Sequence, residues 1–419
     1  MGNCVSLSSE IGKLEKVIIH SPGFEVEEMT PKSAEQVLYN DILPLPVIAE
    51  DHKELKKVLS MVSTVYEVQD LLIDVLQDNA VKEKFVDTII NFMPHIEHRE
   101  KELKDMTPAE LANGAIVGIK EKKDTLTRFL SDNIFDLPPL PNLYFMRDSA
   151  IVVNDSVITG SMANKVRIME ALIAKFIFKY HKDFMSNGFI FDGTKSKNES
   201  NVTIEGGDLL VLREDVLAVG ISERTSPETI DIVSDRIAAN LQKPFTIFAV
   251  VLPKERATIH LDMIFTMVDI EHCVVHKPYV LAKNILPVVK ITVMPDGSKK
   301  YEYVENIVEG LKTVGIHLKP IICGGADSLH QEREQWLSGT NFFAFDIGKF
   351  IGYDCNIRTL DEISRAGFEV LHASDVISGK KKIDDYKKCV IGIDGAELAR
   401  GGGGVRCMTM PVKRKPVQW

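Results

Sequence analysis

The sequence of 419 residues lacks three features that would assign it at once to a broad class. It has no apolar run long enough to span a membrane, and its first ten residues, MGNCVSLSSE, contain no apolar signal segment. It also has no excess of positive charge: 60 acidic residues oppose 50 basic ones, which argues against a nucleic-acid backbone as the main partner. We therefore expect a cytoplasmic protein, and its net charge of −10 would suit a small cationic substrate.

Paired cysteines are missing as well. The sequence has no CxxC motif, so the cysteines resemble reduced cytosolic thiols and each must be judged by its own surroundings. His272 and His276 flank Cys273, but they lie in an apolar strand pair with no fourth ligand in view, and we expect no zinc there. The six cysteines are Cys4, Cys273, Cys323, Cys355, Cys389 and Cys407.

The first residues, Met1–Ser6, fit the pattern for N-myristoylation, and Cys4 within this segment could be palmitoylated. A disordered arm before the first strand is the simpler interpretation, because the pattern is short. The remaining composition, with 45% hydrophobic residues, is that of a folded protein with a sizeable core. The length alone predicts roughly two to three domains.

Residues 71–129 differ from the rest of the chain. They are rich in helix formers and contain no strand-like run, and Thr107-Pro108 is a typical helix start. The sequence after them, SDNIFDLPPLPNLYF, contains helix breakers and returns the chain to another architecture. We therefore predict an inserted helical domain at 71–129, within a catalytic α/β domain formed by 1–70 and 130–419.

A repeated unit accounts for most of the second region. Four segments each contain two short apolar strands joined by a tight polar turn, which predicts a hairpin, and several are followed by a helix and another strand. Residues 301–323 fit the helix and strand after the third hairpin, and the first 70 residues contain a shorter fifth copy. Such repetition predicts a radial array of α/β units. The hairpins are expected at 147–160, 205–220, 260–275 and 339–353, with helices at 165–181, 227–241 and 356–366.

Polar residues recur where the first strand of a unit begins. In a radial array, equivalent positions of successive units face the same end of the axis, so these side chains should converge. Asp262 follows His260 by two residues, which places both on one side of an extended segment. The converging residues are Asp148, Glu205, Asp208, His260 and Asp262.

Cys407 lies after four consecutive glycines, in RGGGGVRC at 400–407. Glycine permits a close approach of the backbone that no side chain would allow, although a flexible hinge with a packed thiol would also explain the loop. Arg406 or a bound cation could favour a nucleophilic thiolate, and His260 would be its general acid or base. The clustered carboxylates require a cation, either a metal or a guanidinium, and only a guanidinium also explains the cysteine.

Six motifs together resemble the arginine deiminase family of guanidino-group modifying enzymes, from about Leu14 to Trp419. In chain order they are NLYFMRD at 142–148, MANKVR at 162–167, IEGGD at 204–208, VGISERT at 219–225, HLD at 260–262 and RGGGGVRCMTMP at 400–411. The resemblance implies a five-bladed α/β propeller, a homo-oligomer (dimer or tetramer), and hydrolysis of L-arginine to citrulline and ammonia without metal or organic cofactor.

The resemblance also implies roles for individual residues. Cys407 would form a covalent amidino-thioether, and His260 would protonate the departing ammonia and then activate water. Asp148 and Asp262 would hold the guanidinium, and Glu205 would hold His260. The substrate's remaining contacts would come from Arg167 and Arg224, which match carboxylate binders, and from Asn142, Phe145 and Gly401.

One position departs from the family pattern. Many members have a second arginine in the loop, as RGRGG, where this sequence has Gly402. A side chain that could gate the pocket or hold the carboxylate end is therefore absent. Three alternatives stay open: hydrolysis of agmatine or a methylated arginine, a dihydrolase that continues to ornithine, or a catalytically silent arginine-binding protein. Arg167 and Arg224 argue against agmatine, which has no carboxylate.

Overall fold

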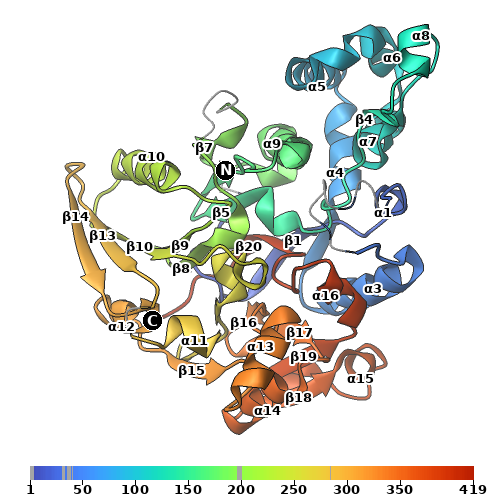
Figure 1. Cartoon of the computed structure of the whole chain (residues 1–419). Helices are drawn as coiled ribbons and strands as arrows, with labels where there is room; N and C mark the ends of the chain where they lie inside the picture. The colour runs from blue at the N-terminus through green and yellow to red at the C-terminus, as the bar shows by residue number, and fades with distance from the viewer. Residues whose placement is uncertain (1–3, 31–33, 35–38, 40, 196–200, 284) are drawn as a thin grey trace.

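The computed structural model has a mixed α/β fold, and it describes residues 4–30, 34, 39, 41–195, 201–283 and 285–419. Within these ranges, no helix is both long and apolar enough to cross a bilayer. In Figure 1, helices α3 (Leu45–Val62), α10 (Pro227–Ala238), α12 (Ile307–Lys312) and α14 (Ile357–Arg365) lie at the periphery, and strands such as β1 and β8 lie nearer the middle.

Within the described residues, the predicted repeats form five sheets of three or more strands. Each sheet contains an antiparallel pair of strands and a further strand parallel to a member of that pair. The first is β2 (Thr64–Glu67), β1 (Leu14–Ile19) and β20 (Met410–Arg414), and the second is β5 (Ala150–Val153), β6 (Ser156–Thr159) and β7 (Phe189–Asp192). The third is β14 (Lys299–Val304), β13 (Val288–Val293), β10 (Phe245–Val251), β9 (Val216–Ile221) and β8 (Leu209–Arg213). The fourth is β11 (Phe265–Met267), β12 (His272–Val275) and β15 (Lys319–Ile322), and the fifth is β16 (Phe343–Asp346), β17 (Lys349–Tyr353), β19 (Cys389–Ile393) and β18 (Glu369–His372).

All four predicted hairpins are confirmed as antiparallel pairs, namely β5 with β6, β8 with β9, β11 with β12, and β16 with β17. The three predicted helices are confirmed as α9 (Ile168–Tyr180), α10 and α14. Helix α10 begins where sequence rules place it: Ser226 accepts a hydrogen bond from the Thr229 amide, and Pro227 occupies the first turn. The first sheet is completed by the C-terminal strand β20, so the two ends of the chain share one sheet.

The prediction of a helix from residue 301 is wrong for the first residues of that segment. Lys299–Val304 forms strand β14, which pairs antiparallel with β13, and the helix α12 begins only at Ile307 after the cap residue Asn306. Tyr301 and Tyr303 favour a strand, and pairing with β13 outweighs the helix-like spacing of their neighbours.

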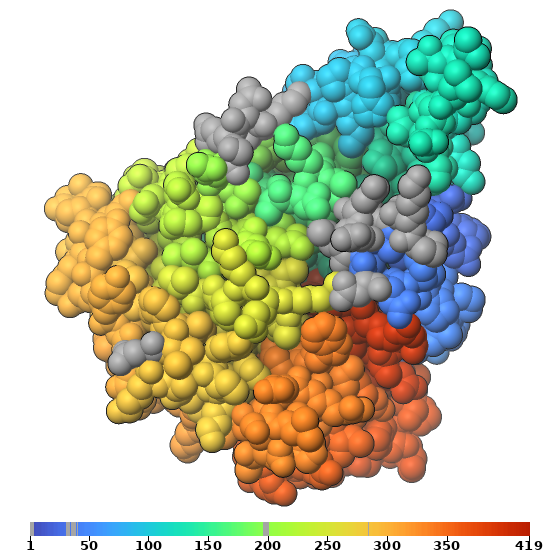
Figure 2. Space-filling model, in the orientation of Figure 1, coloured from blue at the N-terminus to red at the C-terminus, as the bar shows by residue number. Residues whose placement is uncertain are grey.

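The region 71–129 is helical as predicted, and it projects from the sheets at the upper right of Figures 1 and 2. Thr107 and Glu110 form a capping box at the start of α7, which confirms the predicted helix start. The expected absence of strands is wrong at Ile119–Lys120, where the short strand β3 pairs with β4 (Phe135–Leu137). The helices are α4 (Val68–Leu76), α5 (Asn79–Phe92), α6 (Glu100–Asp105), α7 (Pro108–Val117) and α8 (Leu126–Phe129).

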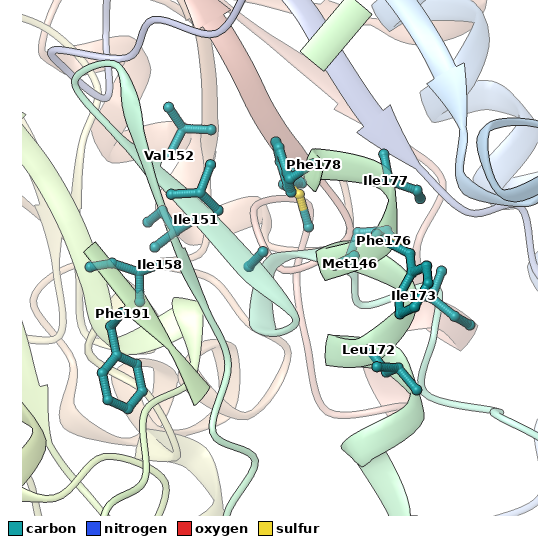
Figure 3. Packing of buried hydrophobic residues seen from close by; sticks show 14 of the residues in the cluster. Met146, Ile151, Val152, Ile158, Leu172, Ile173, Phe176, Ile177, Phe178 and Phe191 are labelled. Carbon is teal, nitrogen blue, oxygen red and sulfur yellow. The ribbon is translucent and has the colours of Figure 1, made fainter. Parts of the chain in front are cut away.

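These helices share an apolar core with α9. The rings of Phe85 on α5 and Phe176 on α9 meet edge to face, with their centroids 5.0 Å apart. Figure 3 shows Phe176 on α9, and Ile151 and Val152 of β5 belong to the same buried cluster. This packing fixes α9, and therefore the turn immediately before it, which carries Arg167.

The prediction of a disordered N-terminal arm is wrong from Cys4 onward. The side chains of Val5 and Leu7 are fully buried, and Ser6 and Leu7 form backbone bridges to Lys413 and Asn154. The apolar residues of this segment complete the core beneath the sheets, and burying them stabilises an ordered conformation. Residues 1–3, on which the acylation pattern depends, lie outside the described residues.

Candidate active site

Short 3₁₀ turns bring the predicted polar residues together. Each of three hairpins is preceded by such a turn: Met146–Asp148, Gly206–Asp208 and Leu261–Met263. The second turn contacts both others, and a Cβ on Gly206 would lie only 2.0 Å from the carbonyl oxygen of Arg147. The predicted convergence is therefore confirmed, although Asp262 lies in a turn rather than in the extended segment that was expected.

A cavity of about 300 Å³ lies at this junction. Glu205 and Asp262 are fully buried behind its wall, where each contacts residues that line it. Eight of the ten residues predicted for the site line the cavity itself: Asn142, Phe145, Asp148, Arg167, Arg224, His260, Gly401 and Cys407.

His260 is held between carboxylates. Its Nε2–H donates a hydrogen bond to Glu205 Oε2 at 3.1 Å, and its Nδ1 lies 3.7 Å from Asp148 Oδ1. Burial disfavours the imidazolium, but the charges of Asp148 and Glu205 outweigh it and raise the pKa of His260 to about 9. His260 is therefore protonated near neutral pH and ready to act as an acid.

Asp208 supports this arrangement from outside the cavity. Its Oδ1 accepts a hydrogen bond from the Leu261 amide at 2.9 Å, and its Oδ2 accepts one from the Ser222 hydroxyl. Burial is the largest influence on its pKa, which rises to about 6. Asp208 thus fixes the backbone that carries His260 and Asp262.

Cys407 is buried and faces negative charge. Its amide donates a hydrogen bond to Asn341 Oδ1, and its Sγ lies 3.9 Å from Asp262 Oδ2. Burial, followed by the charges of Asp262 and Asp148, raises the pKa of the thiol well above its ordinary value. Arg406 lowers this pKa, as expected, but burial and the two carboxylates outweigh it, and its guanidinium is paired with Asp262 and Glu10.

Two buried carboxylate oxygens have no hydrogen-bond partner in the described part of the chain. They are Oδ1 of Asp148, which lines the cavity, and Oδ1 of Asp262, which lies behind its wall. A buried acceptor without a donor carries a desolvation cost of about 1–3 kcal/mol. A planar guanidinium, which has five N–H donors, can satisfy both oxygens at once.

Arg167 is fully engaged with acidic residues. Its Nη1 donates to Asp148 Oδ2 at 2.8 Å, and its Nε and Nη2 donate to the Glu170 carboxylate. Arg224 makes one longer hydrogen bond, of 3.4 Å, to Glu205 Oε1. A metal could in principle be held by atoms of Asp148, Glu205 and His260, which lie close together. The guanidinium of Arg167 already balances the charge of these carboxylates, and its Nη1 lies 3.6 Å from Glu205 Oε2.

The glycine loop is packed as tightly as the sequence predicted. A Cβ on Gly403 would lie 2.6 Å from the Phe145 ring, and one on Gly404 would lie 2.6 Å from Asn341 Cβ. Gly402 has a φ of +94°, a conformation that other residues rarely adopt. The run of glycines therefore serves close packing around Cys407 rather than a flexible hinge.

The sequence did not identify several residues at the site, among them Arg256 and Glu255 in the cavity lining, Asn341 at the Cys407 amide and Glu10 at Arg406. Asn341 lies at the start of the fourth hairpin, where the other hairpins carry their polar residues, so the repeat pattern contained a signal for it. Glu10 gave no such signal. Its carboxylate binds the Arg406 guanidinium at 3.1 Å from the N-terminal segment, 396 residues away in the chain.

We expect Glu10→Gln to destabilise the fold by about 3 kcal/mol, because it leaves the buried Arg406 without one of its two carboxylates. The charges of Arg406 and Arg147 outweigh burial and lower the pKa of Glu10 to about 2, so it is ionised at neutral pH. Urea unfolding measures the loss. Glu15→Gln is the matched control, since Glu15 pairs with Lys413 at the surface and should contribute less than about 1 kcal/mol. Equal losses for both variants would contradict the assignment.

The chain matches the family model "Arginine deiminase" over residues 35–414. It is 32% identical to an arginine deiminase of Bacillus cereus (strain B4264) over the full length of both proteins. It is 31% identical to an arginine deiminase of Borrelia recurrentis, covering 99% of this chain and 98% of that one.

Solved structures share the fold at low identity. The N-terminal domain of ArgZ covalently bound to a reaction intermediate gives a TM-score of 0.52 at 12% identity, covering 95% of this chain and 98% of that one. An amidinotransferase of saxitoxin biosynthesis, SxtG from Microseira wollei, gives 0.53 at 13% identity with 99% coverage of each chain. On the family match and the full-length relatives, this chain belongs to the arginine deiminase family.

Proposed function

We propose that this protein hydrolyses the guanidinium group of L-arginine to give L-citrulline and ammonia. The observation that carries the proposal is a pair of carboxylate oxygens without a hydrogen-bond partner among the described residues, Oδ1 of Asp148 and Oδ1 of Asp262. Asp148 lines the cavity with Cys407, and Asp262 lies behind its wall with Oδ2 3.9 Å from Cys407 Sγ. Membership of the arginine deiminase family names the same substrate. We infer that the substrate cation bridges the two carboxylates and places its central carbon against Sγ.

Substrate binding prepares the nucleophile. Asp262 and Asp148 raise the pKa of the Cys407 thiol in the free protein. A guanidinium between them neutralises this field, so the thiol loses its proton to solvent more readily. The thiolate then attacks the guanidinium carbon, and the resulting adduct retains its hydrogen bonds to both carboxylates.

His260 transfers the protons that complete the reaction. It protonates the departing nitrogen, the C–N bond breaks, ammonia leaves, and an amidino-thioether remains on Cys407. The neutral imidazole then takes a proton from water, which attacks the same carbon. The C–S bond breaks as the added hydroxyl gives up its remaining proton to the departing thiolate, so citrulline leaves and the Cys407 thiol is restored. Glu205 accepts the His260 Nε2–H hydrogen bond and stabilises the imidazolium in both steps.

One assay distinguishes the products of related reactions. L-Arginine is incubated with purified protein, and citrulline, ornithine, ammonia and urea are measured together. Equal amounts of citrulline and ammonia are expected. Ornithine with two equivalents of ammonia would indicate a dihydrolase, and faster turnover of agmatine or a methylated arginine would indicate a sister activity. No turnover with intact arginine binding would indicate a silent scaffold.

The finer architecture remains part of the proposal. We infer that the five sheets form a five-bladed propeller, because each repeats an antiparallel pair and a parallel strand and the 3₁₀ turns of three sheets meet at the site. Residues 71–129 would be an inserted helical domain in the catalytic domain of 1–70 and 130–419. We also propose a homo-oligomer in the cytoplasm that needs no metal or organic cofactor.

The pH dependence tests His260 as the acid. Because the pKa of His260 is about 9, its acid form is lost as the pH rises through that value. We expect kcat/KM to fall on the alkaline side near pH 9. In Glu205→Gln the imidazolium loses an anionic partner, so its pKa falls and the alkaline limb moves to lower pH. Comparing the two enzymes cancels the titration of arginine itself; an unmoved limb would contradict the assignment.

A further inference from the structure

Strand β14 is an exposed edge of the molecule. It lies at one end of the third sheet, whose order is β14-β13-β10-β9-β8, and it pairs only with β13 among the described residues. Residues 300–303 of this strand are exposed, and the hairpin of β13 and β14 lies at the left of the molecule in Figures 1 and 2. An edge strand presents a row of unpaired backbone N–H and C=O groups, which can pair with a further strand.

The edge of β14 lacks the usual protection against such pairing. Short length, proline and register shifts all hinder the addition of a strand to an edge. The edge strands β2, β7, β15 and β18 have four residues each, and β15 also contains Pro320. Strand β14 has six residues without proline, and it pairs with β13 without a register shift. It is therefore a regular template for another strand.

The hairpin turn fixes which backbone groups of β14 face outward. The Met294 amide donates a hydrogen bond to the Ser298 carbonyl at 2.9 Å, and hydrogen-bonded and non-hydrogen-bonded pairs alternate along an antiparallel ladder. The even-numbered residues of β14 therefore bond to β13, and the backbone groups of its odd-numbered residues point away from β13. These outward-facing residues are Lys299, Tyr301 and Tyr303.

The side chains of β14 complement those of a second copy of the same strand. A two-fold axis at Tyr301, the middle outward-facing residue, pairs two copies antiparallel over residues 299–303. Lys300 then lies opposite Glu302 of the second copy, and symmetry repeats this pair of opposite charges. An axis at Lys300 or at Glu302 would instead oppose like charges.

The same pairing covers two exposed aromatic rings. The side chains of Tyr301 and Tyr303 are 55% and 83% exposed, and they lie two residues apart on one face of the sheet. With the axis at Tyr301, the Tyr301 rings of the two copies are opposite each other, and Tyr303 is opposite Lys299. Cross-strand pairs of aromatic residues stabilise the association of strands.

We propose that two copies of this protein associate through antiparallel pairing of their β14 strands, which joins the third sheets of both copies into one continuous sheet. The proposal goes beyond the catalytic function and gives the homo-oligomer a defined surface. The catalytic turn Gly206–Asp208 precedes β8, at the opposite edge of the third sheet. A variant that cannot dimerise should therefore keep its turnover.

Charge reversal tests the pairing, with sedimentation equilibrium of the full chain as the measurement. Lys300→Glu or Glu302→Lys places like charges opposite each other at both symmetric positions, and each should raise the dimer dissociation constant at least about 10-fold. The double variant, Lys300→Glu with Glu302→Lys, exchanges the charges and should return to within about threefold of the wild type. An equimolar mixture of the two single variants should form heterodimers, because one strand then carries only negative charges and the other only positive ones.

Tyr301→Pro tests the backbone pairing. It removes an outward-facing N–H that β13 does not use, so the fold should persist while the dimer dissociation constant rises at least about 10-fold. Arg365→Glu is the matched control, since Arg365 pairs with Glu362 on the exposed side of helix α14, and its reversal should leave the dimer unchanged. Thermal unfolding shows that each variant is folded.

The outcomes separate the interface from the catalytic function. A wild-type protein that stays monomeric at about 100 µM, or a dimer that neither single charge reversal weakens, would overturn the proposal. Citrulline release is measured per chain for every variant. Absence of release from a wild-type protein that dimerises as described would count against the catalytic function and leave the interface standing.

Discussion

The Cys407→Ser variant is expected to fold normally and to release no measurable ammonia from L-arginine. A serine hydroxyl ionises far less readily than a thiol. Among the described residues, His260 is protonated near neutral pH and cannot act as the base, and Asp262 and Asp148 oppose a new negative charge. Removal of the nucleophile from a covalent catalyst can lower turnover by about a million-fold, and we expect a loss of more than about 10,000-fold here. Ammonia and citrulline release measure the effect.

A second cysteine provides the matched control. Cys355 is half-buried and lies outside the catalytic cavity, so Cys355→Ser should retain most of the activity. Thermal unfolding should show that both serine variants are folded. Mass spectrometry of acid-quenched wild-type protein should detect an amidino adduct on the peptide that contains Cys407. Normal turnover by Cys407→Ser would refute the nucleophile assignment.

The His260→Ala variant is expected to lose about 100- to 10,000-fold in kcat, the range that a positioned general acid or base contributes. Both chemical steps pass a proton through this side chain in the proposed mechanism. Its replacement also removes one of the hydrogen bonds to Glu205, which is fully buried and keeps its longer hydrogen bond from Arg224. Single-turnover experiments with labelled arginine would follow the adduct on Cys407 and show which step is slower.

His317→Ala serves as the comparison, because His317 is exposed and should be replaceable without loss. Circular dichroism and urea unfolding separate a catalytic effect of His260→Ala from a structural one. A loss of less than tenfold in a folded His260→Ala protein would mean that another group transfers the proton.

Local sequence patterns predicted much of the fold. Alternating apolar strands and polar turns are short-range features, so all four hairpins, the helices α9, α10 and α14 and the helix start at Thr107 were recognisable. The prediction failed where a distant partner decided the outcome. Strand β14 exists because β13 pairs with it, and the N-terminal segment is ordered because its apolar residues find a core supplied by other parts of the chain.

The sequence by itself predicted which carboxylates and which histidine meet at the site. The repeat places Asp148, Glu205 and His260 at equivalent positions of successive units, and the glycine run marks the place where Cys407 must pack closely. These are properties of residue type and spacing, which a single chain displays directly.

Only the tertiary structure decided the electrostatics. Arg406 is the residue before Cys407 in the sequence, but its guanidinium binds Glu10 and Asp262. Arg167 is likewise held by Asp148 and Glu170. Charge acts through space and through burial, so the pKa of a thiol depends on groups that are hundreds of residues away in the chain. The sequence therefore determined the set of reactive groups, and the fold determined which of the cations near them are already paired with carboxylates.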